Sequence, residues 1–338
     1  MKQLLIPRYG PPSVLTVREA PDPPVTLGSV RIRVTAAGIN FADLMARQGL
    51  YPDAPKPPCV VGYEVAGVVD AVGDGVTTPR VGDRVIALTR FGGQSDVVVV
   101  PPAQVFPLPG GWTFEQGAAL PVTYLTAHHM LDRVAAARTG ETVLVHAAAG
   151  GVGIAVAELA RIMELRVLGL ASPSKHETLR SYGVEPLDRT DSDWPAAVRR
   201  LAPSGVDVVL DAVGGDSWRR GYALLAPAGR LVCYGVSELS SGLRRNLLGV
   251  VWKAIRWPRF GPVALMNDNR AVAGVNIGHL WSADALIRPQ IERLLGYARE
   301  GRIRPRVDRA FPLVEAAAAH QYIHERRNIG KVVLTFEG

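Results

Sequence analysis

The segment Thr142-Val-Leu-Val-His-Ala-Ala-Ala-Gly-Gly-Val-Gly153 constrains this chain more than any other feature. Its first half is typical of a buried strand, the small residues that follow predict a tight turn, and Ile154–Met163 is expected to form a helix. Such a turn lets the backbone approach a pyrophosphate and directs the first amides of the helix toward its negative charge. The residues predicted to bind a dinucleotide here are Ala149, Gly150, Gly151, Val152 and Gly153.

The pattern of the chain changes near residue 110. Before it, β-branched runs are separated by Gly and Pro clusters, which indicates a compact, barrel-like β region. From about residue 123, strands and helices alternate, which predicts an α/β domain with a doubly wound parallel sheet. Its strands are predicted at 142–147, 166–170, 206–211, 230–235 and 270–275.

Helix ends can also be predicted from side chains that cap them. Thr113 with Gln116, and Ser174 with Glu177, are spaced as capping boxes, and the second would open a helix over 175–182. Two further helices are expected near 282–300 and 314–326, followed by a closing strand over 330–335.

The end of the second strand of the α/β domain bears on the choice of cofactor. Sites for NAD usually place Asp or Glu there, against the ribose hydroxyls. Here the strand Arg166–Ala171 runs into Ser172-Pro-Ser-Lys175, which contains no carboxylate. Ser172 and Lys175 therefore predict a 2′-phosphate and NADPH, although Lys175 as a solvated lysine and Asp188 as a rival carboxylate remain alternatives.

Composition argues against several other classes of protein. The chain has 338 residues and a formal net charge of +7, but its Arg residues are dispersed and no basic block interleaves with aromatic residues. Nucleic-acid binding is therefore not expected. Only two cysteines, Cys59 and Cys233, are present, which is no disulfide framework, and no apolar run approaches the ~18 residues of a membrane span. We expect a cytoplasmic protein.

Several motifs occur in an order that spans nearly the whole chain. They are Gly38-Ile-Asn-Phe-Ala-Asp43, Arg47-Gln-Gly-Leu-Tyr51, Val61-Gly-Tyr-Glu64, Ala147–Gly153 and Gly330-Lys-Val-Val-Leu334. Together they resemble the zinc-free, zeta-crystallin-like quinone oxidoreductase branch of the medium-chain dehydrogenase/reductase superfamily. Within that branch, Asn40–Tyr51 and Ala171–Glu177 are similar to the synaptic vesicle membrane protein homologues.

The resemblance implies a domain organisation and an assembly. A GroES-like β-barrel catalytic domain would be built from residues 1–122 and from the returning segment 278–338, around a Rossmann domain over 123–277. The resemblance also implies a homodimer formed through the last Rossmann strand, near 270–276.

The resemblance further implies that no metal is bound. Where related alcohol dehydrogenases hold catalytic zinc, this chain carries Asn40, Tyr63 and Val122, which do not make a zinc site. Without a Lewis acid to hold an alkoxide, alcohol oxidation is not expected. The expected substrate is an electrophile that accepts hydride readily, such as a quinone or an enone.

By the same resemblance, Asn40 and Tyr51 lie beside the nicotinamide. Asn40 would donate a hydrogen bond to the acceptor carbonyl, and Tyr51 would relay a proton, which solvent can also supply. The alternatives are a turn-stabilising Asn and a packing Tyr. Met45 replaces a Tyr of related enzymes, which makes the pocket more apolar. Further cofactor contacts are expected at Thr126, Val213, Gly214, Tyr234, Gly235 and Asn276.

Other polar residues are expected to be structural. Asp43 and Arg47 are spaced as an ion pair on one helix face, and Glu64 is expected to be buried. His320 and His324 lack the acidic residue of a zinc-protease motif, which favours a solvated helix face over a metal site.

The basic segment Arg244–Phe260, with two Trp residues, has two interpretations. It is either an amphipathic helix at an acidic membrane surface or a helix that covers the active-site mouth and buries its Trp residues, and we favour the second. Arg244 and Asn246 are also expected near the cofactor phosphates.

The function predicted from these features is an NADPH-dependent reduction of quinones or α,β-unsaturated carbonyls. Two alternatives remain open. One is a cofactor-sensing protein that binds membranes or RNA without turnover. The other is an enoyl-thioester reductase.

Overall fold

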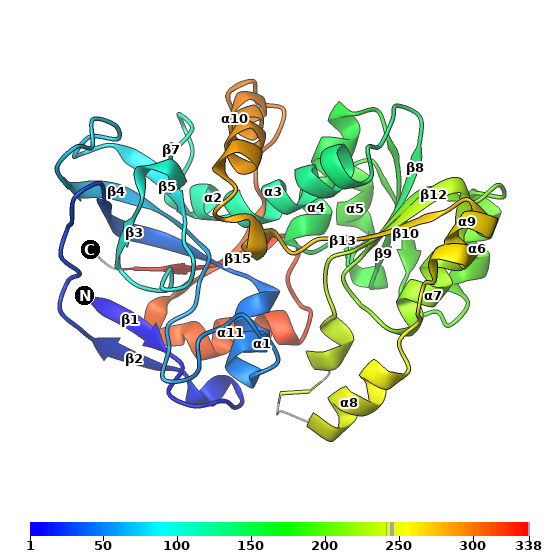
Figure 1. Ribbon diagram of the computed structural model, residues 1–338, viewed down its shortest axis with the longest axis horizontal. Helices are drawn as coiled ribbons and strands as arrows, with labels where there is room; N and C mark the ends of the chain where they lie inside the picture. Colours follow the sequence, from blue (N-terminus) through cyan, green and yellow to red (C-terminus); the bar gives the residue numbers. More distant parts are fainter. Residues whose placement is uncertain (241, 244–246, 337–338) are drawn as a thin grey trace. The chain divides into compact units, whose positions relative to one another are not determined.

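The computed structural model describes residues 1–240, 242–243 and 247–336, and the chain divides into two compact units (Figure 1). Unit 1 comprises Met1–Leu125, Gly242–Arg245 and Gly278–Gly338. Unit 2 comprises Thr126–Ser241 and Asn246–Ile277. Segments from both ends of the chain therefore fold together in unit 1, and the central segment forms unit 2.

Unit 1 is built around a seven-stranded sheet. The path of the sheet is β14–β15–β3–β4–β5–β7, with β6 paired to β3. The strands are β3 (Val30–Ile39), β4 (Glu64–Val72), β5 (Arg84–Leu88), β6 (Val97–Val100), β7 (Val105–Pro107), β14 (Val307–Pro312) and β15 (Lys331–Thr335). Strand β15 pairs antiparallel with β3, so the C-terminal segment completes the sheet that the N-terminal segment begins.

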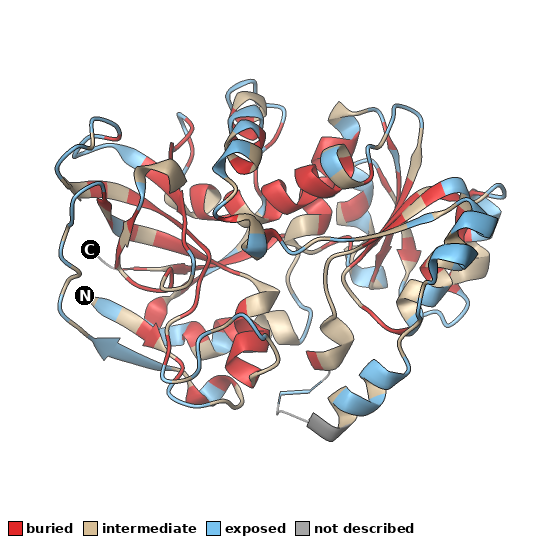
Figure 2. Ribbon diagram, in the orientation of Figure 1, coloured by how far each residue is buried: buried red, intermediate tan, exposed pale blue. Residues whose placement is uncertain are grey.

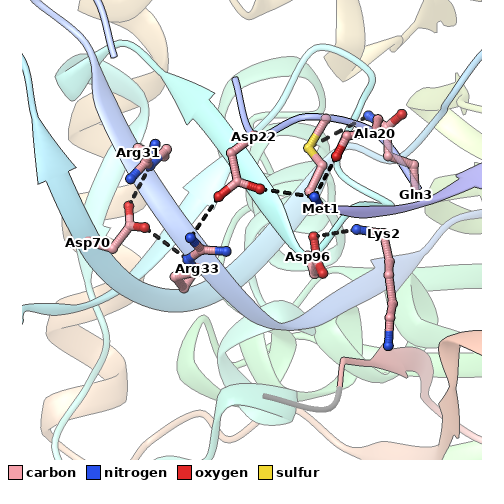
Figure 3. A network of polar contacts seen from close by, with 9 residues as sticks. All are labelled: Met1, Lys2, Gln3, Ala20, Asp22, Arg31, Arg33, Asp70 and Asp96. Atoms are coloured by element: carbon pink, nitrogen blue, oxygen red, sulfur yellow. Dashed lines mark hydrogen bonds and ion pairs between the residues drawn. The ribbon is translucent and has the colours of Figure 1, made fainter. Parts of the chain in front are cut away.

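The alternation along β3 separates the core from the surface. Val30, Ile32 and Val34 are buried, whereas Arg31 and Arg33 lie between them on the other face. Asp70 on β4 accepts hydrogen bonds of 2.9 Å from both arginines, as Figure 3 shows. On the outer face of the sheet, ion pairs therefore join β3 to β4, and on the inner face the aliphatic side chains of β3 pack into the core.

Helices and a small two-stranded sheet complete unit 1. Thr113 and Gln116 form the predicted capping box at the start of α2. The last helix begins at Ala316 and ends at His324, two residues inside each predicted end. The elements are β1 (Lys2–Leu5), β2 (Thr16–Glu19), α1 (Phe41–Gln48), α2 (Phe114–Ala118), α10 (Asp284–Arg299) and α11 (Ala316–His324), and α3 (Pro121–His128) crosses into unit 2.

Unit 2 contains the predicted doubly wound parallel sheet. Its order is β10–β9–β8–β11–β12–β13, with every pair parallel. The strands are β8 (Thr142–His146), β9 (Arg166–Ala171), β10 (Val184–Asp188), β11 (Val206–Asp211), β12 (Leu225–Cys233) and β13 (Ala271–Gly274). The strand order reverses between β8 and β11, and ligands of such sheets bind at the carboxyl ends of the strands around this point.

Helices on unit 2 begin close to their predicted positions, with one difference in capping. The helix predicted over 175–182 is α5 (His176–Ser181), but Ser174 does not cap it. Pro173 starts a 3₁₀ turn over Pro173–Lys175, so Lys175 occupies the N-cap position and Ser174 lies before it. The other helices are α4 (Gly151–Ile162), α6 (Trp194–Leu201), α7 (Asp216–Ala223), α8 (Leu247–Ile255) and α9 (Pro262–Asp268).

Burial is concentrated in the central strands of each sheet and in α4, as Figure 2 shows. Helices α8 and α9 are largely exposed, with Ile255 at 71% and Met266 at 74%. In the part of the chain that the structure describes, no helix is long and apolar enough to cross a membrane.

Candidate active site

The glycine-rich turn of unit 2 lies at the carboxyl end of β8. Gly150 occupies the N-cap position of α4, and no side chain caps that end. A Cβ atom at Gly153 would overlap with the carbonyl group of Ala148, so only glycine fits there. Within the described residues, no side chain therefore caps the first amides of this helix, an arrangement that fits a dinucleotide pyrophosphate.

Two predicted residues and one unpredicted residue lie where β9 and β10 end. Ala171 is in register with Asp188, which places the residues after each strand side by side. Arg189 donates from its backbone amide to the Ala171 carbonyl at 3.0 Å and from Nε to Ser172 Oγ at 3.0 Å. Lys175 follows in the next turn, where its amide donates to the Ser172 carbonyl at 2.9 Å.

One oxygen of the rival carboxylate at this edge already accepts two hydrogen bonds. Asp188 Oδ1 accepts hydrogen bonds from the Thr190 hydroxyl at 2.7 Å and from the Thr190 amide at 2.8 Å. These bonds hold the pKa of Asp188 below its ordinary value. The Asp188 carboxylate thus stabilises the turn that follows β10.

The loop after β11 is held by a buried carboxylate. Asp211 is fully buried, and its Oδ1 accepts from the amides of Val213 at 2.6 Å and Gly214 at 3.1 Å. The Ser217 hydroxyl donates to Asp211 Oδ2 and lies 3.2 Å from Nδ1 of His146, the last residue of β8. Burial lowers the pKa of His146. This network fixes the loop that borders the switch point of the sheet.

The remaining predicted cofactor residues lie at separate places. Thr126 is buried in α3. Tyr234 follows β12 and donates from its amide to the Asp211 carbonyl at 2.9 Å, and the next residue, Gly235, packs against Ala212. Asn276 is exposed after β13.

In unit 1, three side chains form a closed polar network. Lys331 Nζ contacts Glu64 Oε1 at 2.5 Å and donates to Asn40 Oδ1 at 2.6 Å. Asn40 Nδ2 donates to Glu64 Oε1 at 3.0 Å, and the Val122 amide donates to Glu64 Oε2 at 2.7 Å. Glu64 is 0% and Lys331 4% exposed, whereas Asn40 is half-buried. The expected burial of Glu64 is confirmed, and its partner Lys331 was not predicted.

The backbone of Asn40 is held as firmly as its side chain. Asn40 is the N-cap residue of α1, and its amide donates to Asp43 Oδ2 at 2.8 Å. Asp43 Oδ1 accepts from the Gly62 amide at 3.1 Å. Burial raises the pKa of Asp43 to about 7. Both ends of this carboxylate therefore bind backbone amides.

These contacts contradict the predicted Asp43–Arg47 ion pair. Arg47 is fully buried and donates from Nη1 to the Gly10 carbonyl at 2.8 Å, while its Nε and Nη2 have no partner among the described residues. The helical spacing was suitable, but Asp43 is needed at the N-terminus of its own helix. Burial lowers the pKa of Arg47 to about 10.

The predicted solvated face of α11 is also wrong. His320 is fully buried, and neither ring nitrogen has a partner within the described part of the chain. Burial, together with the nearby Arg47 and His324, lowers the pKa of His320 to about 3. The side of α11 that carries His320 therefore faces the interior.

Tyr51 belongs to an aromatic cluster. Its ring meets Tyr63 edge-on at 6.3 Å, and Tyr63 contacts Phe91 at 5.3 Å and Trp281 at 6.4 Å. Trp281 Nε1 donates to the Thr89 carbonyl at 2.8 Å. Burial raises the pKa of Tyr63. The cluster gives Tyr51 an apolar wall and leaves its side chain half-buried.

The three positions compared with zinc ligands have other contacts in this structure. The Asn40 amide is paired at both its oxygen and its nitrogen, the Tyr63 ring packs in the aromatic cluster, and Val122 contributes only its amide. Among the residues that the structure describes, no group of three or more His, Cys, Asp or Glu side chains is placed to hold a metal ion.

The basic segment 244–260 is described only in part. Arg244 and Asn246, expected near the cofactor phosphates, lie outside the described residues. Trp257 packs on Trp218 at 5.1 Å and donates to Glu238 Oε1 at 2.5 Å, but it is only half-buried. Trp252 is 58% exposed, so the prediction that both Trp residues are buried is wrong.

Two separate parts of the chain match known protein families. Residues 26–110 match the alcohol dehydrogenase GroES-like domain family, and residues 184–334 match the family described as zinc-binding dehydrogenase. The synaptic vesicle membrane protein VAT-1 homolog of Rattus norvegicus is 43% identical over 95% of this chain and 80% of its own length. The chain spans 66% of the length of the Danio rerio relative, at 42% identity.

Solved structures show the same relationship. The human synaptic vesicle membrane protein VAT-1 homolog-like protein matches with a TM-score of 0.87 and 34% identity, over 100% of this chain and 98% of that one. A Pseudomonas syringae quinone oxidoreductase matches with a TM-score of 0.85 and 30% identity, over 99% of both chains. Mycobacterial Rv1454c complexed with NADPH matches at 0.86 and 29%, also over 99% of both.

Solved structures of proteins with other activities match this chain about as well. They include a CurK enoyl reductase, with a TM-score of 0.85, and an NAD-dependent alcohol dehydrogenase, with a TM-score of 0.82, each 29% identical over 99% of both chains. The GroES-like and dehydrogenase matches, the parallel sheet with its glycine turn and the VAT-1 relatives agree. The chain belongs to the medium-chain dehydrogenase/reductase superfamily of oxidoreductases, in the group that contains the synaptic vesicle membrane protein VAT-1 homologs.

Proposed function

We propose that this protein is an NADPH-dependent reductase that transfers a hydride to quinones or α,β-unsaturated carbonyls without zinc. The observation that carries the proposal is the half-buried amide of Asn40, backed by the buried Glu64–Lys331 pair. This group offers a hydrogen-bond donor where zinc dehydrogenases of the superfamily hold a metal. A donor of this kind stabilises negative charge on an acceptor oxygen and suits an acceptor that is already electrophilic.

The residues at the ends of β9 and β10 support NADPH as the cofactor. Ser172, Lys175 and Arg189 lie together there, and Asp188 is engaged by Thr190. Two cations and a hydroxyl suit a 2′-phosphate, whereas the ribose hydroxyls of NADH are usually held by a carboxylate. The match to an NADPH complex agrees with this choice, and the match to an NAD-dependent enzyme makes a direct comparison of the two cofactors necessary.

In the proposed reaction, bound NADPH supplies the hydride. Asn40 donates to the acceptor oxygen as negative charge develops on it. Tyr51, half-buried against Tyr63, delivers the proton that completes the reduction. In the aromatic cluster, Tyr51 and Phe91 are half-buried and offer planar apolar contacts to a quinone ring, whereas the buried Tyr63 and Trp281 support them from behind.

The test is an acceptor panel with NADPH and NADH measured in parallel. Benzoquinones, naphthoquinones and simple enones are each supplied at several concentrations, and oxidation of the nucleotide is followed by its absorbance. Turnover that depends on the acceptor and prefers NADPH is the expected result. If no acceptor in the panel stimulates NADPH oxidation, the proposal is wrong.

A second candidate is an enoyl-thioester reductase, which the structural match to CurK enoyl reductase favours. It would use the same donor, because the thioester oxygen also gains negative charge when hydride adds to the β-carbon. An enoyl-CoA and its short N-acetylcysteamine analogue belong in the same panel. A strong preference for the CoA thioester over its short analogue and over quinones would favour this second function.

We also propose a homodimer that forms through β13. This strand ends the parallel sheet, and among the described strands only β12 pairs with it. An unpaired edge of this kind is suited to pairing with a second copy. Light scattering on the purified protein should give twice the mass of the chain, and a monomer at micromolar concentration would contradict the proposal.

A further inference from the structure

We propose that Glu64 and Lys331 are positioning residues that lock the side-chain amide of Asn40, so that it presents an N–H donor rather than a carbonyl to the bound acceptor. The inference deepens the proposed function and rests on it, because Asn40 is there the group that meets the acceptor oxygen. It adds the two residues that decide how this group is oriented.

The contacts of the amide leave only one orientation. Asn40 Oδ1 accepts from Lys331 Nζ at 2.6 Å, and Nδ2 donates to Glu64 Oε1 at 3.0 Å. A flipped amide would place its oxygen against the carboxylate and its NH₂ group against the ammonium. Both contacts would then be repulsive, so the charge of each partner favours the observed orientation.

One hydrogen of Asn40 remains after these bonds are made. The amide carries two N–H hydrogens, and only one of them is used toward Glu64. Within the described residues, no protein acceptor is recorded for the other. The carbonyl oxygen is engaged by the Lys331 ammonium, so the polar hydrogen that Asn40 has left to offer is this second N–H.

Burial explains why the pair would act through Asn40. Glu64 is 0% and Lys331 4% exposed, whereas Asn40 is half-buried. Of the three side chains, Asn40 is therefore the one with surface left to meet a ligand. This difference separates a positioning pair from a pair that touches the acceptor.

The carboxylate is itself held from several sides. Val122 donates its amide to Glu64 Oε2 at 2.7 Å, and Lys331 contacts Oε1 at 2.5 Å. At Gly38, a Cβ atom would lie 2.5 Å from Glu64 Oε1, so the missing side chain makes room for the carboxylate. The Asn40 backbone is fixed independently by Asp43. A donor held this way needs no reorganisation during the reaction, which is the condition for effective charge stabilisation.

The test is a double-mutant cycle of Asn40→Ala and Lys331→Met, measured as kcat with saturating NADPH and the best quinone acceptor. In the wild-type background, Lys331→Met should lower kcat by about 100-fold, the usual effect of losing one donor to an oxyanion. In the Asn40→Ala background it should change kcat less than about twofold, because the group it positions is gone. Full and equal losses in both backgrounds would overturn the inference.

Two further variants keep the test valid if Lys331→Met does not fold. Glu64→Gln combined with Lys331→Met removes both buried charges together and should show the same loss of kcat. Lys331→Arg retains a cationic donor to Asn40 and should restore kcat to within about tenfold of wild type. Melting temperature and NADPH affinity are measured for each variant, so that kcat is compared where every variant is folded and saturated. A purely structural role of Lys331 would give the same loss of kcat in the Asn40→Ala background as in the wild type.

The same measurements separate this inference from the function on which it rests. If the wild-type protein reduces no acceptor, the proposed function fails and the inference fails with it. If the wild-type protein turns over but the cycle is additive, or if Lys331→Arg is as impaired as Lys331→Met, only the positioning role is overturned.

Discussion

Two polar regions of this protein use charge in opposite ways. In unit 1, Glu64 and Lys331 are buried and paired with each other and with Asn40. In unit 2, Arg189 is exposed and donates hydrogen bonds to the hydroxyl of Ser172 and to the backbone carbonyl of Ala171, with Lys175 in the adjacent turn. The charges of the first region are buried and satisfy one another, whereas the Arg189 guanidinium of the second region is accessible to a ligand.

The difference between buried and exposed charges separates the residues that stabilise the fold from those that select the cofactor. Removing one partner of a buried ion pair commonly costs about 3–5 kcal/mol, whereas an exposed pair contributes about 0–1 kcal/mol. A buried pair can therefore hold a group in place, but it is hard to alter. Exposed cations can be exchanged at little cost in folding, which makes them suitable for discriminating between cofactors.

The largest expected effect is on folding and tests the buried region. Lys331→Met leaves the Glu64 carboxylate buried without its cation and should lower the free energy of unfolding by about 3–5 kcal/mol. Arg189→Met should change it by less than about 0.5 kcal/mol. Urea denaturation followed by circular dichroism measures both. Equal effects would remove the distinction between the regions.

The next effect concerns a buried group that lacks a partner. His320 has a pKa of about 3 in the folded protein, below its ordinary value of 6.5. The unfolded chain therefore takes up a proton that the native protein does not, and the contribution of His320 to stability is lost as the pH falls below 6.5. Between pH 7.5 and pH 5 the loss is about 2 kcal/mol.

His320→Leu removes this titration and is the matched variant. Relative to the wild type, it should gain about 2 kcal/mol in unfolding free energy when the pH is lowered from 7.5 to 5. Asp43, whose pKa is raised to about 7, changes stability in the opposite direction, but it is present in both proteins and cancels in the difference. A difference that does not vary with pH would show that His320 is protonated as readily in the folded protein as in the unfolded chain.

Substitutions in the region of Lys175 and Arg189 should change cofactor binding rather than the stability of the fold. Lys175→Ala and Arg189→Ala are each expected to raise the KM for NADPH by about tenfold, or ~1.4 kcal/mol, and to change the KM for NADH less than about twofold. Arg180→Ala, on the exposed side of α5, is the control for a general loss of positive charge. Equal effects on both nucleotides would contradict the assignment of a 2′-phosphate site.

The smallest expected effect is that of salt on the kinetic constants, and it should differ between the two regions. Raising the ionic strength from about 0.05 to 0.5 M screens exposed charges and should increase the KM for NADPH several-fold. The buried Glu64–Lys331 pair is screened much less, so kcat with saturating NADPH should remain nearly constant. A parallel fall of kcat with salt would mean that the buried network is open to ions.

Local patterns allowed much of the fold to be predicted. The strand–turn–helix around Gly150–Gly153 and the capping box of Thr113 and Gln116 are confirmed, because neighbouring residues alone decide them. Strand β10 was missed, since it is short and Pro186 lies in its middle. That omission hid Arg189, whose place beside Ser172 follows from the register of β10 with β9.

Contacts between distant parts of the chain could not be predicted from local sequence patterns. Lys331 and Asn40 are 291 positions apart, and the pairing of β15 with β3 brings their strands together. Asp43 and Arg47 were predicted to pair because of helical spacing, but packing directed the aspartate to the helix N-terminus and buried the arginine elsewhere. Spacing along a helix shows which residues can meet and does not show which other partners compete for them.

The sequence by itself determined the parallel α/β architecture, the glycine turn and the family of this protein. Those features depend on residue size and periodicity over a dozen neighbouring positions. Only the tertiary structure decided that Glu64, Lys331 and Asn40 form one network, that Arg189 joins Ser172 and that His320 is buried. A buried charge is tolerated only beside a partner, and the folded chain alone brings such partners together.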